Sequence, residues 1–422
     1  LSTFNLSDIP LSQLSLEILS FPKHKKLLMV KLRKVVILSA KRTPVGAFQG
    51  SISSVPAHQL GASVIQAVLE ETGIDSGMID EVIMGNVLSA GQGQAPARQA
   101  ALGAGLPNSV ECLTINKMCG SGLKAVMLAV QAIQTGDAEI IIAGGMENMT
   151  QAPYLLPKGR DGHRLGHGQL IDSMIQDGLW DVYNNKHMGN CAEMCAHDKN
   201  YSREDQDSFA KASYTRAQLA QENGLFTDEI ISVSVPQRKG DSLAVDKDEE
   251  PGRANFEKMV KLRPAFEKDG TITAANASKI NDGAAAMMLI SLEKAKELGL
   301  IPLATVVAQA SSAHDPEWFT TAPSKAIQKV LEKANLKVED IDLWEINEAF
   351  APVAMAAIED FKLDHDKVNV NGGAIAIGHP IGGSGARILT TLIHAMKNRD
   401  VKTGLATLCI GGGEASALVV RR

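Results

Sequence analysis

The stretch SVECLTINKMCGSG (residues 109–122) decides how the chain is expected to fold, because it joins a strand to a helix. An apolar strand is expected over 109–115, and the helix that follows has apolar residues on one face, namely Leu123, Val126, Met127 and Val130. Cys119 lies at the start of this helix, where free backbone N–H groups and the helix dipole favour a thiolate. Gly120 and Gly122 leave room for a substrate. A buried structural cysteine is the alternative, but this turn favours a reactive one.

Short apolar strands alternate with amphipathic helices on both sides of this stretch. Strands are expected at 35–38, 81–84 and 140–143, and helices at 59–71 and 125–134. This alternation predicts an α/β fold with a mostly parallel sheet covered by helices.

The second half of the chain weakly repeats the first. Three segments of the first half resemble three of the second in the same order and at similar separations: 79–86 and 341–347, 119–122 and 382–385, and 140–145 and 407–412. Glycine-rich turns after strands also look alike by chance, but the shared order favours a duplicated α/β domain.

An inserted subdomain is expected between the halves, because residues 151–280 are richer in charge, histidine, methionine and proline. The expected domains are a first half over 31–150, to which 281–299 return, the inserted loop domain over 151–280, and a second half over 300–422. Residues 1–30 are expected to be a disordered extension, because they lack the arginines of a transit peptide and the clean apolar stretch of a secretory signal.

The composition argues against several classes of partner. The net charge is −6 and aromatic residues make up 4%, so neither nucleic acid nor a membrane surface is an expected partner. No apolar run approaches the ~20 residues that span a bilayer. The 5 cysteines form no framework of spacings, which indicates a reduced, cytoplasmic protein.

Three further loops carry residues suited to chemistry. His379 lies among glycines in NGGAIAIGHPIGGSGAR (residues 371–387), Cys409 follows an expected strand and precedes a glycine run, and Asn347 begins NEAF after another expected strand. Such loops lie at the carboxyl ends of strands, where active sites of α/β sheets gather. Two cysteines, a histidine and an asparagine there predict nucleophilic acyl transfer. A purely structural histidine at residue 379 is the alternative.

One possible metal site involves the inserted subdomain. His187, Cys191 and Cys195 are four residues apart and would share a helix face near His197, in a pattern open to zinc. Gly189 and the lack of a clear fourth ligand favour ordinary helix-face residues. We therefore expect no metal.

The four loops together resemble the thiolase family, from about residue 35 to the C-terminus. The motifs NKMCGSG, NEAF, GHP and CxGGG occur in family order, and residues 43–46 (TPVG) and 276–278 (NAS) resemble further family signatures. The resemblance implies a layered αβαβα fold built from two duplicated α/β halves plus an inserted loop subdomain. It also implies that the protein assembles as a homotetramer.

The resemblance implies a role for each catalytic residue. Cys119 would carry the acyl group as a thioester, after His379 has activated its thiol. Cys409 would remove the α-proton of the second acyl-CoA. Asn347 would hold a water that forms one oxyanion hole with His379, and the backbone N–H groups of Cys119 and Gly411 would form the other.

The resemblance also implies substrate contacts, at His187, Met188, Leu262, Phe266, Ser278 and Phe350. The His187–Met188 pair resembles the short-chain branch of the family. The implied activity is acetyl-CoA C-acetyltransferase: two acetyl-CoA molecules condense reversibly to acetoacetyl-CoA and CoA, which are substrates and products, so no cofactor is expected. A broader 3-ketoacyl-CoA thiolase of β-oxidation is the alternative.

Two classes that share the fold compete with this interpretation. A ketosynthase would combine its cysteine with two histidines, or with a histidine and an asparagine, whereas here Cys409 supplies a cysteine as the deprotonating group. A carrier without catalytic activity would be expected to lack Cys119 or His379. The sequence therefore favours the thiolase.

Overall fold

The computed structural model describes residues 16–19, 27–30 and 32–422. Strands β1 (Leu16–Leu19) and β2 (Leu27–Val30) pair with each other in antiparallel fashion. The rest of the extension that was expected to be disordered lies outside the described residues.

The main sheet has ten strands and consists of two half-sheets. In spatial order, the first contains β6 (Glu111–Ile115), β5 (Glu81–Gly85), β7 (Ile140–Asn148), β14 (Asn281–Ser291) and β3 (Val35–Arg42), and the short β4 (Gly46–Ala47) pairs with β14. The second contains β16 (Leu343–Ile346), β17 (Thr403–Ile410), β18 (Glu414–Arg421) and β15 (Ala304–Ala313). The half-sheets join where β3 and β15 pair along a short antiparallel stretch.

The two half-sheets share one topology. The last strand of each half in chain order, β14 or β18, lies beside the first, β3 or β15, and runs antiparallel to both of its neighbours. An isolated parallel bridge between Trp344 and Val368 marks the edge of the second half, where β6 lies in the first. The repeat predicted from the sequence is therefore present in the strand order.

The prediction of a mostly parallel sheet is wrong for hydrogen-bonded neighbours. Only β6–β5, β5–β7 and β16–β17 are parallel pairs of this sheet. The reason is that β14 and β18 each insert between strands that run the other way, which local βα alternation does not reveal.

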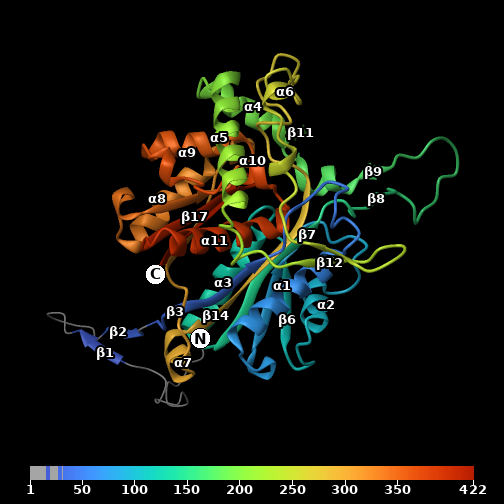
Figure 1. Ribbon diagram of the computed structural model, residues 1–422. Coiled ribbons are helices and arrows are strands. Elements are labelled where there is room, and N and C mark those ends of the chain that lie inside the picture. The colour runs from blue at the N-terminus through green and yellow to red at the C-terminus, as the bar shows by residue number, and fades with distance from the viewer. Residues whose placement is uncertain (1–15, 20–26, 31) are drawn as a thin grey trace, which may run out of the picture.

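Helices form three layers around the half-sheets. Helices α3 (Ser121–Thr135) and α11 (Ile381–Asn398) pack together between them, as Figure 1 shows near the middle of the molecule. The first half is covered outside by α1 (Ala57–Thr72) and α2 (Pro96–Gly103), and the second by α8 (Ala322–Ala334) with α9 (Ala351–Phe361) beside it. This is the αβαβα arrangement that was expected.

Close contact between the two central helices depends on glycine. A Cβ on Gly122 would lie 2.8 Å from the backbone nitrogen of Ala386, and one on Gly385 would lie 2.3 Å from that of Leu123. Any side chain there would push the helices apart. Cys119 and His379 each lie two residues before one of these helices. The close helix contact that Gly122 and Gly385 allow therefore also brings the two predicted catalytic groups together.

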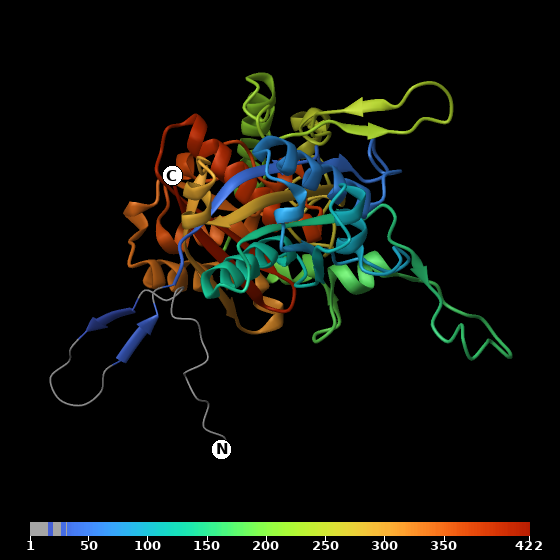
Figure 2. The same cartoon turned by 90° about the horizontal axis from the view of Figure 1, so that it is seen from below.

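Residues 151–280 contribute no strand to the main sheet. They form α4 (Met188–Asp198), α5 (Arg203–Glu222), α6 (Phe256–Met259) and the paired strands β8 (Tyr154–Leu155) with β9 (Ile171–Asp172), β10 (Trp180–Asp181) with β11 (Lys186–His187), and β12 (Val233–Val235) with β13 (Leu243–Val245). The loops of two hairpins, β8–β9 and β12–β13, extend away from the body (Figure 2). The exact domain boundaries stay predictions.

The remaining elements are short helices: η3 (Ser76–Met78), η4 (Met174–Leu179), η5 (Pro251–Arg253), α7 (Leu292–Glu297), η6 (Pro316–Thr321), η7 (Val338–Asp340), η8 (His365–Lys367) and α10 (Ala374–Ile377). Within the described ranges, no helix has the length and apolar character needed to cross a bilayer.

A buried ion-pair cluster fastens the inserted segment to the first half. Arg42, at the end of β3, donates from Nε to Glu229 (2.6 Å) and from Nη1 and Nη2 to Asp248 (2.7 and 2.9 Å). All three side chains are fully buried. Removal of the guanidinium would leave two carboxylates without a counter-charge in the interior.

We predict that Arg42→Met lowers the free energy of unfolding by about 3–5 kcal/mol, the usual cost of breaking a buried ion pair. The matched control is Lys397→Met, which removes an exposed pair with Asp228 and should cost roughly 0–1 kcal/mol. Denaturant unfolding measures both values. Equal losses in the two variants would contradict the structural role of the cluster.

Candidate active site

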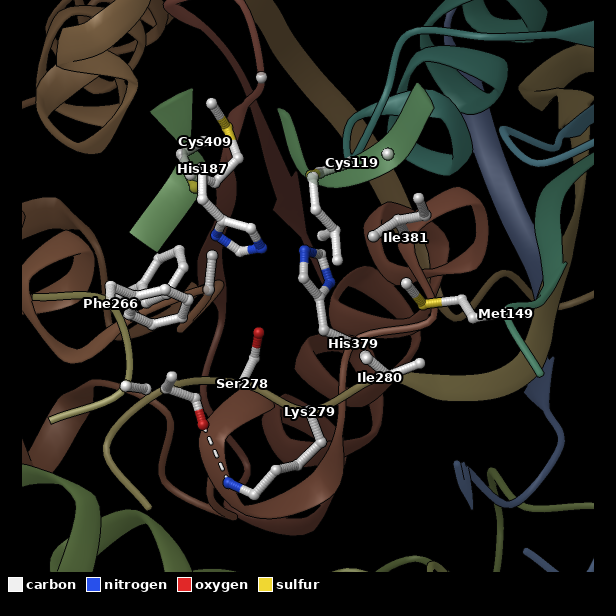
Figure 3. A pocket seen from close by; sticks show the side chains of 18 of the residues that line it. Cys119, Met149, His187, Phe266, Ser278, Lys279, Ile280, His379, Ile381 and Cys409 are labelled. Carbon is white, nitrogen blue, oxygen red and sulfur yellow. Dashed lines mark hydrogen bonds between the residues drawn. The ribbon is translucent and has the colours of Figure 1, made fainter. Parts of the chain in front are cut away.

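The predicted catalytic loops meet in one cavity of about 320 Å³ between the two halves. Nine of the predicted site residues line it: Cys119, His187, Met188, Phe266, Ser278, Phe350, His379, Cys409 and Gly411. Figure 3 shows Cys119 and the rings of His187 and His379 around the same space. Asn347 and Leu262 are not among its lining residues.

Local hydrogen bonds shape the turn that carries Cys119. Asn116 Oδ1 accepts the backbone N–H of Met118 (2.9 Å), and Ser121 Oγ accepts that of Lys117 (2.9 Å) while donating to the Met118 carbonyl (2.6 Å). Met118 has a φ of 46°, a left-handed conformation that is strained for a residue with a side chain. Two polar side chains of the NKMCGSG motif thus hold a strained backbone just before the cysteine.

The Cys119 thiol is neutral in the free protein. Burial raises its pKa to about 11, although the backbone N–H groups of Gly411 and of Cys119 itself act in the opposite direction. The helix start therefore does not overcome desolvation at this position. The thiol needs a base before it can attack a substrate.

His379 is held so that one ring nitrogen is available as that base. Ser384 Oγ donates to the Pro380 carbonyl (2.8 Å), so its oxygen accepts the Nδ1–H of His379 (2.6 Å). This arrangement assigns the proton to Nδ1 and leaves Nε2 with a free lone pair. Nε2 is buried and forms no hydrogen bond with a described residue.

Burial, with a smaller contribution from Arg387, lowers the pKa of His379 to about 3. The imidazole is therefore neutral at pH 7, with the Nε2 lone pair unprotonated. The His379 backbone N–H is fixed by Asn281 Oδ1 at 2.9 Å, so both the position and the tautomer of the ring are set.

Cys409 lies at the end of β17, beside the first thiol. It is buried, and burial together with the nearby Cys119 raises its pKa well above the usual value. The chain then turns through Gly412 and Gly413, which have φ values of 90° and 81°. This glycine turn places the Gly411 N–H beside the Cys119 thiol.

Asn347 does not line the cavity, but Ala349 and Phe350 of the same loop do. Asn347 is buried, and its backbone N–H donates to the Thr407 carbonyl (3.0 Å). Neither Oδ1 nor Nδ2 of its side chain has a hydrogen-bond partner among the described residues. The side chain therefore has the capacity that its predicted water-holding role requires.

Residues of the inserted segment form the opposite wall. His187 caps α4, where its Nδ1 accepts the Gly189 N–H (3.0 Å), and its ring stacks on Phe266 with centroids 4.8 Å apart. Phe266 meets the edge of Phe350 at 5.8 Å. A Cβ on Gly189 would lie 2.3 Å from the Phe266 ring, so this packing requires a glycine directly after Met188.

Leu262 lines a separate outer cavity of about 190 Å³ and is 37% exposed. Lys279 and Ala274 line both cavities. The structure therefore does not bring Leu262 to the acyl-sized cavity with Phe266.

Several apolar lining residues were not predicted from the sequence: Met149, Leu179, Ile280, Phe319 and Ile381. Ile280 and Ile381 lie within two residues of the NAS and GHP motifs, which was a usable signal, whereas the other three lie in segments without a motif. Within residues 16–19, 27–30 and 32–422, no three histidine, cysteine, aspartate or glutamate side chains are placed to hold a metal ion. His187 and Cys191 instead serve α4 as a cap and a core residue.

Comparisons with known proteins agree with this geometry. The family model "Thiolase, N-terminal domain" matches residues 35–293, and "Thiolase, C-terminal domain" matches 300–422. An acetyl-CoA acetyltransferase of Pseudomonas aeruginosa is 54% identical over 392 residues, which is 93% of this chain and 100% of that protein.

Two solved structures are also similar. The Bacillus anthracis acetyl-CoA acetyltransferase has a TM-score of 0.91 at 42% identity, over 93% of this chain and 99% of that one. An Ascaris suum thiolase in complex with coenzyme A has a TM-score of 0.88 at 44% identity, over 92% and 100%.

We predict that iodoacetamide alkylates Cys119 about tenfold faster for each pH unit between about pH 7 and about pH 10, because only the thiolate reacts and its fraction rises tenfold per unit below the pKa. Peptide mass spectrometry locates the label, and Cys119→Ser provides the blank. A rate that levels off below pH 8 would show that the free thiol is not neutral.

Proposed function

The chain belongs to the thiolase family, and on that premise we propose that it is an acetyl-CoA C-acetyltransferase that condenses two acetyl-CoA molecules reversibly to acetoacetyl-CoA and CoA. The observation that carries the proposal is the convergence of Cys119, His379 and Cys409 on one small cavity. The named relatives supply the substrate class. The residue roles below are those that the resemblance to the thiolase family implies, and the geometry of the cavity supports them.

In the first half-reaction, His379 Nε2 takes the proton of the Cys119 thiol. The thiolate attacks the thioester carbon of the first acetyl-CoA, and the bond from this carbon to the CoA sulfur breaks. CoA leaves with the proton returned by the imidazolium. The N–H groups of Cys119 and Gly411 stabilise the oxyanion that forms in between.

In the second half-reaction, Cys409 gives its thiol proton to His379 Nε2, and the Cys409 thiolate removes a proton from the methyl group of the second acetyl-CoA. The enolate oxygen is stabilised by the Nε2–H of the resulting imidazolium and by a water on Asn347. The carbanion attacks the acetyl carbon on Cys119, and the Cys119 sulfur leaves as a thiolate that takes back the proton from His379 Nε2.

Burial is the largest cause of the raised pKa of Cys409. The Cys409 thiolate, once formed, is therefore a strong base that is suited to removing the weakly acidic α-proton.

The cavity favours short acyl groups. Met188 is buried, and its Sδ would lie 3.7 Å from a Cβ on Gly411, so it stands directly against the oxyanion loop. Phe319 and Phe350 close the adjacent wall, with ring centroids 6.2 Å apart. Broader cleavage of 3-ketoacyl-CoA is the second candidate, because the methionine side chain in this wall is unbranched and flexible.

The setting of the enzyme is part of the proposal. We infer a cytoplasmic homotetramer that serves fatty acid metabolism. Leu165 and Leu170 on the β8–β9 hairpin are 99% and 69% exposed, and such apolar side chains on a protruding loop suit a contact with a second copy. Light scattering measures the assembly.

We predict that Cys409→Ala still acetylates Cys119 but condenses acetyl-CoA about 10²–10⁴-fold more slowly, because it lacks only the base for the α-proton. Mass spectrometry of the Cys119 peptide follows the first step, and acetoacetyl-CoA absorbance follows the second. Cys195→Ala, a buried cysteine outside the cavity, is the control and should keep both. Loss of both steps in Cys409→Ala would contradict the division of roles.

Chain length supplies a separate test. Met188→Ala should raise the ratio of C8 to C4 ketoacyl-CoA thiolysis roughly tenfold or more, because removing side-chain volume from a pocket changes discrimination by about 1–3 kcal/mol. Met288→Ala, which empties the outer core of the first half, controls for general loss of stability. An unchanged ratio in Met188→Ala would remove this residue from the pocket argument and leave the chemistry untouched.

A further inference from the structure

A partly buried lysine lies beside the catalytic cavity without taking part in the proposed chemistry. Lys279 follows Ser278, and its side chain turns away from the space that Ser278 and His379 face (Figure 3). Its Nζ donates to the Ala277 carbonyl at 2.9 Å and to the Ile375 carbonyl at 3.4 Å. Because burying an ammonium group is costly, this position calls for a physical reason.

The surroundings of Lys279 suit a cation. Nζ lies 5.4 Å from the centroid of the Tyr214 ring, a distance at which a ring face attracts an ammonium group. Glu250 and Glu348 both favour the charged form of the lysine. Tyr214 comes from α5, Glu250 precedes η5 and Glu348 follows β16, so three separate segments converge on one charge.

The two carbonyls that accept from Lys279 belong to different loops of the active site. Ala277 precedes Ser278 and forms an isolated bridge with Phe350, and both Ser278 and Phe350 line the cavity. Ile375 lies in α10, four residues before His379. The ammonium group therefore connects the loop of the Ser278 contact directly to the loop of the catalytic base.

We propose that Lys279 is a positioning residue, whose ammonium group acts as a built-in cation that holds the Ser278 loop and the His379 loop together. Without the charge, two carbonyl dipoles would face each other across a buried gap with no donor between them. Both loops would then relax, and His379 Nε2 would lose its alignment with Cys119. This inference rests on the proposed acyl transfer.

The charge on Lys279 depends on pH. Burial lowers its pKa to about 8, against the opposing effects of Glu250 and Glu348. The facing Tyr214 hydroxyl has its pKa raised by burial, so it stays neutral over this range. The ammonium group is present below about pH 8 and lost above it, and the clamp is expected to weaken in the same direction.

The test compares Lys279→Met, Lys279→Arg and Lys279→Ala with wild type. Because a small misplacement of reacting groups costs up to about 10²-fold, Lys279→Met should lower kcat for condensation by roughly 10–100-fold and raise KM for acetyl-CoA. Lys279→Arg keeps the charge, so it should retain more activity and move the alkaline limb of the pH profile up by about one unit or more. Lys199→Met, at a partly buried lysine outside the cavity, should match wild type.

Chemical rescue distinguishes a lost cation from a lost side chain. Ammonium chloride should restore Lys279→Ala several-fold in a saturable manner, whereas tetramethylammonium, which cannot donate hydrogen bonds, should not. This readout and the pH profile of Lys279→Arg remain informative if Lys279→Met fails to fold.

Unchanged kcat, KM and alkaline limb in Lys279→Met would overturn the inference, as would equal rescue by both cations. Acetylation of Cys119 in the wild type, followed by mass spectrometry, is measured alongside. If that step fails, the proposed function is wrong; if it succeeds while all Lys279 variants behave as wild type, only the positioning role is wrong.

Discussion

The close approach of helices α3 and α11 is the constraint on which the site depends. Each helix begins at the centre of the molecule, and Gly122 and Gly385 remove the side chains that would separate them. A predicted catalytic group lies two residues before the start of each helix: Cys119 before α3 and His379 before α11. Duplication of one α/β unit thus supplies two equivalent helix starts, and the nucleophile and its base come from opposite halves of the chain.

Burial then sets the charge states of the groups that have been brought together. It keeps the Cys119 thiol and the His379 imidazole neutral at rest, so that charge appears only when a proton moves between them. Ser384 fixes which imidazole nitrogen is free. A site that stores no ion pair before the substrate arrives is suited to stabilising the oxyanion and the enolate that appear during the reaction.

The sequence predicted the repeat and most of the residues that line the cavity, because strand ends, glycine turns and their motifs are local signals. The layers were expected from the resemblance to the thiolase family. The sequence failed where distant segments decide. The return of residues 281–299 to the first half was expected, but not that β14 would lie between β3 and β7 and antiparallel to both. Strand β3 continues past residue 38 because residues 39–42 pair with β14, far along the chain. Phe319 lines the cavity and Leu262 does not. Both positions depend on how distant segments pack, which the spacing of residues in the sequence does not reveal.

A crystal structure of the protein soaked with acetyl-CoA tests the central claim most directly. The account predicts an acetyl group on the Cys119 sulfur, with its carbonyl oxygen between the N–H groups of Cys119 and Gly411. The Cys409 sulfur should lie next to the methyl carbon of a second acetyl-CoA. Acetylation at another residue, or a second acetyl-CoA bound away from Cys409, would contradict it.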